Sequence, residues 1–245
     1  LYDGVGESGS LGAAIMINDL RGLSRLRILM YHSVSDNPCD PFAIHPEVFA
    51  QQVCDLVGRR CQVLPLDEAV VRLRRWGIPT QMMALTFDDG YQDFLYAAAP
   101  ILRQYGLPAH WDSYDKTKRL MDWDELQEVQ RLGFSVASHT VSHLRLPECD
   151  EKALSYQLTH ALETLRTRLA EAVILVLSYP FGHFGHREKQ AARRAGYLAA
   201  VGTAGRLGNY PWTDPYQLER EEPNRWWRPI ADARRRPWLR RRSIR

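Results

Sequence analysis

The chain has 245 residues, of which 45% are hydrophobic and 25% charged, and its formal net charge is +3. This length suits one large domain or two small ones with a sizeable core, and no stretch is apolar over the roughly 20 residues that a membrane-spanning helix needs. The charge is uneven, because residues 220–245 hold ten arginines against three acids (+7), while the other 219 residues hold 22 basic and 26 acidic residues (−4).

Short apolar runs alternate with segments of helical periodicity after a Gly- and Ser-rich leader, residues 1–24. This alternation predicts an α/β fold with a parallel sheet, either open and doubly wound or closed as a barrel. No glycine-rich nucleotide-binding motif follows any strand. In chain order we predict a strand over 25–31, helices over 46–60 and 66–77 (Asp67 as cap, Gly77 as stop), a strand over 82–87, a helix over 91–106 interrupted at Pro100, a helix over 121–133, a strand over 134–138, a helix over 150–170, a strand over 172–179, a helix over 186–197, a strand over 198–202, and a basic tail over 221–245.

The two ends of the chain and the cysteines carry weak signals. The tail mixes tryptophans with arginine clusters, which suits nucleic acid or anionic lipid, but we favour a tail without a partner and expect no nucleic acid. The segment "LGAAIMI" (11–17) has no basic residues before it and is a poor signal peptide. The four cysteines lack metal-binding spacing, so we predict mostly buried thiols, although bridges from Cys61 to Cys54 or Cys39 stay open.

Ionisable residues gather where the predicted strands end. His32 follows the first strand, Asp88 and Asp89 follow "MMALTF", and His139 follows "FSVAS" with His143 four residues later. The carboxyl ends of parallel strands form the usual ligand-binding edge of α/β folds. We therefore expect these side chains to share one site.

Two histidines and one carboxylate are a common ligand set for a catalytic divalent metal. If residues 139–143 turn helically, His139 and His143 lie on one face. One of the two aspartates would then bind the metal and the other would act as a general base. Singly, an Asp-Asp-Gly is more often a turn and a histidine pair more often a surface feature, but their joint position at strand ends favours the metal site.

The motifs "LTFDDG", "SHTVSH" and "SYPFG", in this order, resemble those of the polysaccharide deacetylases, carbohydrate esterase family 4 or the NodB-homology group. The opening "ILMYHSVSD" resembles the branch that deacetylates exopolysaccharides such as poly-N-acetylglucosamine. The resemblance covers residues 25–220 and implies a single catalytic domain with a distorted (β/α)7 barrel. It also implies work at the cell envelope on an N-acetylated glycan.

The resemblance assigns roles to individual residues. Asp89, His139 and His143 would bind a divalent metal, most commonly Zn²⁺, with Co²⁺, Ni²⁺ or Mn²⁺ as alternatives. Asp88 would be the base that activates water, and the backbone N–H of Phe181 would stabilise the oxyanion. The implied reaction is hydrolysis of an N-acetyl amide, which releases acetate.

Several positions depart from the family pattern. Ser178 stands where many members carry an arginine that orients the base. The late histidine that serves as general acid is missing, so we predict His32 in this role, with His183 and His186 as weaker candidates. Residues 108–121 are polar and short where the family has an apolar strand, and "YPWTDPYQLER" (210–220) does not match the fourth motif.

Two other functions stay open from the sequence. One is a related hydrolase of a small cyclic amide or ureide, for which a closed pocket would be expected instead of an open aromatic groove. The other is a weakly active carbohydrate-binding relative that keeps the metal ligands but lacks the general acid.

Overall fold

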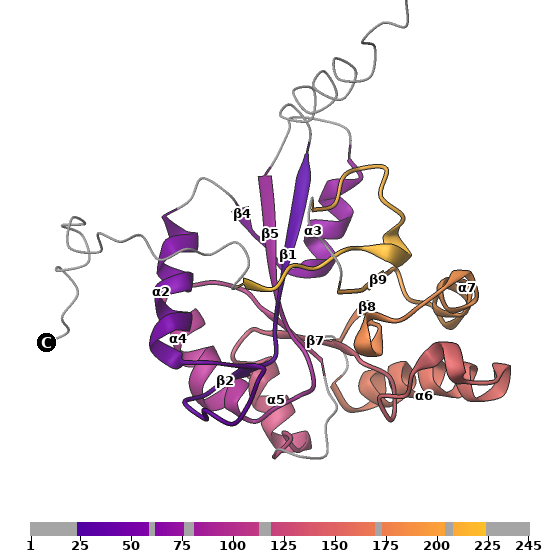
Figure 1. The fold of residues 1–245 in the computed structure, drawn as a ribbon, viewed down its shortest axis with the longest axis horizontal. Helices are drawn as coiled ribbons and strands as arrows, with labels where there is room; N and C mark the ends of the chain where they lie inside the picture. The colour runs from indigo at the N-terminus through magenta and orange to yellow at the C-terminus, as the bar shows by residue number, and fades with distance from the viewer. Residues whose placement is uncertain are drawn as a thin grey trace, which may run out of the picture.

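The computed structural model describes residues 24–58, 62–75, 81–112, 119–169, 173–203 and 208–223. All of the leader except Ser24, most of the basic tail, Gly77 and Cys61 lie outside these residues, so the predictions made for them remain predictions. The α/β alternation predicted from the sequence is confirmed (Figure 1). The strands are β1 Arg25–Tyr31, β2 Ser33–Val34, β3 Ala43–Ile44, β4 Gln62–Val63, β5 Gln81–Phe87, β6 His110–Asp112, β7 Ser135–Ser138, β8 Val173–Ser178 and β9 Ala199–Val201.

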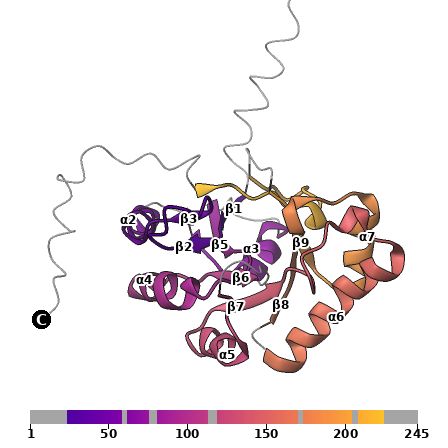
Figure 2. The same cartoon turned by 60° about the horizontal axis from the view of Figure 1, so that its bottom comes forward.

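Apart from α3, which packs on the concave side, the helices pack around the outside of a curved sheet (Figure 2). Apart from α3, they follow the strand order, as expected when each strand is followed by a crossover to the next parallel strand. None of the described helices combines the length and the hydrophobicity needed to cross a bilayer. The α-helices are α2 Pro46–Val57, α3 Leu66–Leu73, α4 Ala99–Gln104, α5 Trp123–Arg131, α6 Glu151–Leu169 and α7 His186–Ala195; a π-helical turn, Phe94–Ala98, precedes α4, and short 3₁₀ turns occupy Leu146–Glu148, Pro180–Gly182 and Pro215–Gln217.

The main sheet has seven strands, and its path runs β1–β5–β6–β7–β8–β9, with β4 also paired to β5. Every pairing in it is parallel. No strand of the described chain pairs with both β1 and β9. Instead, isolated bridges join the two edges through residues 218–221, where Leu218 pairs with Val201 and Glu221 pairs with Leu29. The carboxyl ends of the strands therefore lie at one end of a strongly curved sheet.

One apolar cluster fills the concave side of this sheet. Alternate residues from β1, β5, β7, β8 and β9 meet there, and α3 packs against β1, β5 and β8. Strands this far apart in the sheet can share a cluster only if the sheet curves around it. The cluster comprises Leu26, Ile28, Leu66, Ala69, Val70, Leu73, Met82, Ala84, Ala137, Ile174, Val176, Ala199, Val201 and Leu218.

The structure corrects three local expectations. The polar segment 108–121 keeps a three-residue strand, β6, that pairs with both β5 and β7, so this strand of the sheet is short but present. Helix α3 is capped by Pro65, and Asp67 lies inside its first turn. Among the described cysteines only Cys54 is buried, whereas Cys39 is exposed, which departs from the expectation of mostly buried thiols.

Candidate active site

The two adjacent aspartates after β5 point to different partners. The Asp88 N–H donates to the Tyr31 carbonyl at 2.9 Å, which extends the strand pairing by one residue. Asp89 and Gly90 then adopt left-handed conformations, with φ of 68° and 77°. Asp and Gly tolerate this region best, and the turn aims the second carboxylate away from the first. The neighbouring carboxylates of Asp88 and Asp89 therefore contact two separate groups of residues.

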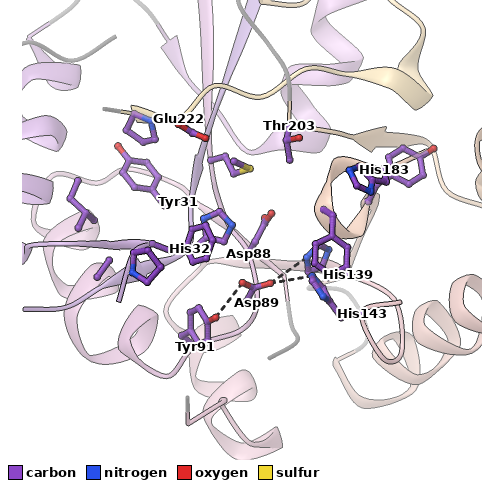
Figure 3. Close-up of a pocket in the computed structure, with 18 of the residues that line it drawn as sticks. Tyr31, His32, Asp88, Asp89, Tyr91, His139, His143, His183, Thr203 and Glu222 are labelled. Carbon is purple, nitrogen blue, oxygen red and sulfur yellow. Dashed lines mark hydrogen bonds and ion pairs between the residues drawn. The ribbon is translucent and has the colours of Figure 1, made fainter. Parts of the chain in front are cut away.

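Asp89, His139 and His143 come together as the sequence predicts (Figure 3). Asp89 Oδ1 lies 3.4 Å from His139 Nε2 and 3.5 Å from His143 Nε2. The three ligand atoms all lie within 4.8 Å of one another. The Tyr91 hydroxyl donates to Asp89 Oδ2 at 3.3 Å, so one carboxylate oxygen faces the two histidines and the other faces Tyr91.

The hydrogen bonding of His139 favours a cation between these atoms. His139 Nδ1 lies 2.9 Å from the Ser178 carbonyl oxygen, which can only accept a hydrogen bond. Nδ1 therefore carries a proton, so in the neutral imidazole Nε2 presents a lone pair to the Asp89 carboxylate. Facing acceptors of this kind are stabilised by a shared metal ion, and a carbonyl that fixes the tautomer is the usual outer partner of a histidine ligand.

A left-handed loop, not a helical turn, brings the two histidines together. Thr140 and His143 have φ of 71° and 52°, so the helical spacing expected from the sequence is wrong, although the proximity it predicted is present. The amide of Gln157, buried in α6, holds this loop. Its Oε1 accepts from the N–H groups of Val141 and Ser142 at 3.0 and 2.9 Å, and its Nε2 donates to Ser142 Oγ at 2.7 Å.

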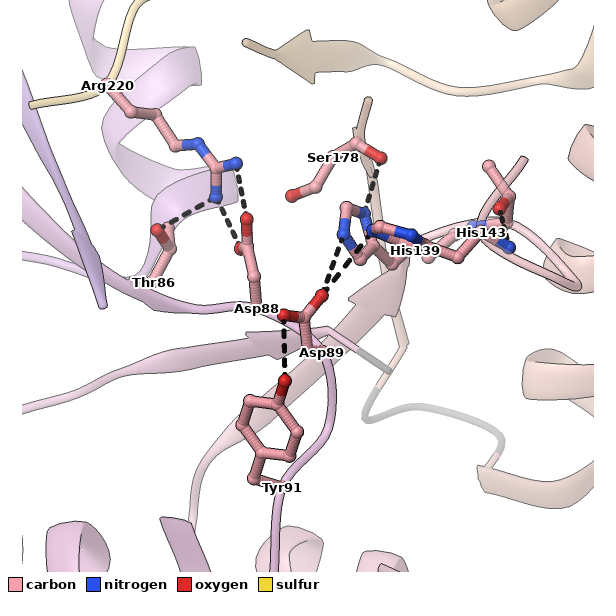
Figure 4. Close-up of polar contacts among 10 residues, drawn as sticks. Thr86, Asp88, Asp89, Tyr91, His139, His143, Ser178 and Arg220 are labelled. Atoms are coloured by element: carbon pink, nitrogen blue, oxygen red, sulfur yellow. Dashed lines mark hydrogen bonds and ion pairs between the residues drawn. The ribbon is translucent and has the colours of Figure 1, made fainter. Parts of the chain in front are cut away.

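Arg220 replaces the arginine that Ser178 appeared to leave missing (Figure 4). Its Nη1 and Nη2 donate to Asp88 Oδ1 and Oδ2 at 2.5 and 2.6 Å, in a bidentate pair that is almost fully buried. The guanidinium also donates to Thr86 Oγ1 and to the Gly202 carbonyl. Sequence reasoning missed Arg220, because 132 positions separate it from Asp88 and no local motif marks it.

This arrangement fixes the charge of Asp88. Burial alone would raise the pKa of its carboxyl, but the Arg220 guanidinium, through its charge and its hydrogen bonds, holds that pKa well below its usual range. Asp88 is therefore an ionised and rigidly oriented carboxylate at neutral pH.

His32 and Phe181 line the same cavity, which has a volume of about 630 Å³ and also includes Tyr31, Tyr91 and Tyr179. Burial lowers the pKa of His32, and the carboxylates of Asp88 and Asp89 oppose that effect. Phe181 has a left-handed φ of 59°, and within the described residues its N–H donates to no backbone carbonyl. An N–H without a partner at a cavity is suited to a developing oxyanion.

The two weaker histidine candidates lie in different places. His183 lines the cavity, and its Nδ1 lies 2.9 Å from Arg145 Nη1. His186 is exposed at the start of α7, where its Nε2 contacts Gln190, and it does not line the cavity. His32 is thus better placed than His186.

Comparison with known proteins identifies relatives of this chain. The polysaccharide deacetylase family model matches residues 78–200, about half of the chain. YxkH of Bacillus subtilis (strain 168) is 28% identical over 184 residues, and the match covers 74% of this chain but only 65% of YxkH.

Solved structures share the fold. The Streptococcus pyogenes deacetylase PplD, in complex with acetate, has a TM-score of 0.74 and 22% identity, covering 82% of this chain and 96% of PplD. IcaB from Ammonifex degensii has a TM-score of 0.68 and 21% identity, covering 81% and 91%. At these identities the comparison establishes a common fold.

Proposed function

The chain belongs to the polysaccharide deacetylase family, and we propose that it is a metal-dependent hydrolase that removes N-acetyl groups from an N-acetylglucosamine-type polysaccharide. The observation that carries this proposal is the joint presence, in one cavity, of a two-histidine-one-carboxylate cluster and a separate buried carboxylate held by Arg220. The sequence of the opening strand and the likeness to PplD and IcaB support the exopolysaccharide branch.

We propose that Asp89, His139 and His143 hold the metal, with zinc as the first choice because of its affinity for imidazole and carboxylate ligands. When bound, such an ion supplies Lewis-acid polarisation of the amide carbonyl and lowers the pKa of water. Tyr91 and the Ser178 carbonyl orient two of the three ligands. The left-handed loop held by Gln157 orients the third.

The remaining residues move protons and stabilise charge. Asp88 accepts a proton from the attacking water, and Arg220 keeps this carboxylate ionised and aimed at the cavity. The hydroxyl adds to the acetyl carbon, and the Phe181 N–H donates to the oxyanion that forms. His32 must be protonated for the last step, against the lowering of its pKa by burial. It then gives this proton to the leaving nitrogen as the C–N bond breaks, so that acetate and a free amine result.

We also propose the finer architecture that the resemblance implies, a distorted (β/α)7 barrel in a single catalytic domain over residues 25–220. The bridges made by residues 218–221 support closure of this barrel, since they join its first and last strands. The leader over 1–24 and the basic tail over 221–245 would flank this domain, with Glu221, the first residue of the tail, still paired with Leu29 of β1.

Acetate release from N-acetylglucosamine oligomers tests the proposal. The purified chain is assayed after chelation, after zinc or cobalt is restored, and as Asp88→Asn, with the exposed Asp36→Asn as matched control. We expect chelator-sensitive release that Asp88→Asn abolishes and Asp36→Asn retains. Release that survives chelation, or that Asp88→Asn leaves intact, would contradict the mechanism, and stoichiometric metal binding without release would favour a small-amide hydrolase or a binding protein.

A further inference from the structure

Two exposed phenylalanines flank the candidate site. Among the exposed large apolar side chains of the described residues, only Phe42 and Phe181 line the cavity, with 60% and 46% of their surface exposed. Phe181 is covered in part, because the Arg145 guanidinium lies 4.5 Å from its ring centroid and the His143 ring 4.6 Å away. Phe42 meets one aromatic ring of the described chain, that of His32, at 5.0 Å and 33°. Phe42 therefore presents the more open aromatic face.

The loop that carries Phe42 is tied down by its own hydrogen bonds. Asp40 Oδ1 accepts from the Phe42 N–H at 3.0 Å, and the Asp40 carbonyl accepts from the Ala43 N–H at 3.2 Å. Asn37 Oδ1 accepts from the Cys39 N–H at 3.1 Å. The short strands β2 and β3 close the base of the loop. An exposed aromatic ring on a pre-organised loop loses little conformational entropy when a ligand covers it.

We propose that Phe42 is a specificity-determining residue, whose open face stacks on a pyranose ring of the glycan chain bound across the site. The inference rests on the proposed function and adds the position at which the sugar is recognised. A pyranose ring with equatorial substituents, such as N-acetylglucosamine, presents a face of axial C–H groups that packs flat on an aromatic ring. His32, which contacts Phe42 from within the cavity, places this platform next to the predicted general acid.

The chemistry around Phe42 favours a sugar over a purely apolar ligand. The cavity that it borders is lined by carboxylates and imidazoles, which match the hydroxyl and amide groups of a glycan. A ring that stacks on Phe42 would place its polar edge toward these groups. A small cyclic amide held at the metal ligands would not need a platform that is 60% exposed.

Three variants at this position distinguish stacking of a sugar on the Phe42 ring from mere shielding of His32 by an apolar side chain. Phe42→Leu keeps apolar cover over His32 but removes the flat face, Phe42→Trp restores a flat face, and Phe42→Ala removes both. The control is Trp212→Ala, because Trp212 is exposed to the same degree (61%) but stacks on Tyr210 and does not line the cavity. Bound zinc is measured in each variant to show that the site is intact.

The first readout is KM for acetate release from the dimer to the pentamer of N-acetylglucosamine. We expect Phe42→Leu and Phe42→Ala to raise KM by about 3- to 10-fold, as the loss of one aromatic contact predicts, and Phe42→Trp to restore it. Trp212→Ala should match the unaltered chain. Equal KM values for Phe42→Leu, Phe42→Ala and Trp212→Ala would overturn the inference while leaving the deacetylase function intact.

A second readout does not depend on turnover. Calorimetric titration of the same oligomers into chelator-treated protein compares Phe42→Leu with Trp212→Ala. Weaker binding by Phe42→Leu alone supports the platform even if no acetate is released, whereas identical binding refutes it. A failure of the proposed function, which is absence of release from the unaltered chain with zinc, is thus distinguished from a failure of this inference.

Discussion

Replacement of Arg220 by methionine should strongly destabilise the fold and change the ionisation of the predicted base. The guanidinium makes a bidentate ion pair with Asp88 and further hydrogen bonds to Thr86 and Gly202, and neither charged side chain is more than 4% exposed. Methionine fills a similar volume but leaves the Asp88 carboxylate buried without a counterion. Breaking a buried pair in this way costs about 3–5 kcal/mol, a large part of the 5–15 kcal/mol that stabilises a typical domain.

The pair Arg27–Glu221 provides the matched control. It also links residues 218–221, here called the closing segment, to the main sheet, but Arg27 is 24% exposed. Arg27→Met should lower the free energy of unfolding by less than Arg220→Met, about 1–3 kcal/mol, because it leaves the Glu221 carboxylate (8% exposed) without its partner at a partly solvated position. Both variants are measured by urea unfolding at neutral pH. A double-mutant cycle with Asp88→Asn should show a coupling of about 1–3 kcal/mol, since the second substitution removes the stranded charge.

The same variant has a distinctive pH dependence. Without Arg220, burial raises the pKa of the Asp88 carboxyl in the folded state above its value in the unfolded chain. Folding then takes up a proton, so the deficit of Arg220→Met relative to the unaltered chain should shrink as the pH falls from 7 to 5. Additive energies in the cycle, together with a deficit that does not vary with pH, would refute the reasoning.

Three further outcomes are expected. Gln157→Leu removes the acceptor of two backbone N–H groups in the histidine loop and should lower stability by about 2 kcal/mol and weaken zinc binding. Gln157→Glu keeps this acceptor but loses the Nε2 donor to Ser142 Oγ and buries a carboxylate, so it should recover zinc affinity but not full stability; equal zinc affinities in the two variants would contradict this. Tyr91→Phe removes the donor to Asp89 and should weaken zinc binding in a competition titration by about tenfold, with an unchanged melting temperature; unaltered affinity would count against it. The buried Glu188 carboxylate accepts hydrogen bonds from the Gly185 N–H and from Arg187, and these outweigh burial and lower its pKa. The stability that ionised Glu188 contributes is therefore present above its unfolded pKa of about 4.3 and is lost as the pH falls. The difference in melting temperature between the unaltered chain and Glu188→Gln should be seen at pH 7 and should close near pH 3.

Much of the fold could be predicted from the sequence, because each strand and helix carries its own local pattern. The run from Arg25 to Tyr31 is mostly apolar and β-compatible by itself, and α6 is long and periodic. The segment 108–121 was harder to interpret, since β6 is only three residues long and is stabilised by its two neighbours rather than by its own composition. Local pattern does not contain that information.

The parts of the site that are formed by residues close together in the sequence could be predicted. The parts that the fold assembles from distant residues could not. The adjacency of Asp88 and Asp89 and the spacing of His139 and His143 predicted the cluster. The left-handed loop between the histidines depends on Gln157 in the next helix, which the spacing alone does not specify.

The position of Arg220 beside Asp88 depends on the pairing of residues 218–221 with β1, and this pairing joins residues that lie most of the chain apart. The sequence predicted a weakness at Ser178, but the fold compensates for it through this arginine.

A zinc titration with acetate release as the readout tests the central claim most directly. Zinc is added stepwise to the chelated chain in the presence of N-acetylglucosamine oligomers, beside His143→Ala. The account predicts that release rises with added zinc, saturates at one equivalent, and is lost or shifted to much higher zinc in His143→Ala. Release that does not depend on zinc, or that His143→Ala leaves unchanged, would contradict the assignment of Asp89, His139 and His143 as the metal ligands of a deacetylase.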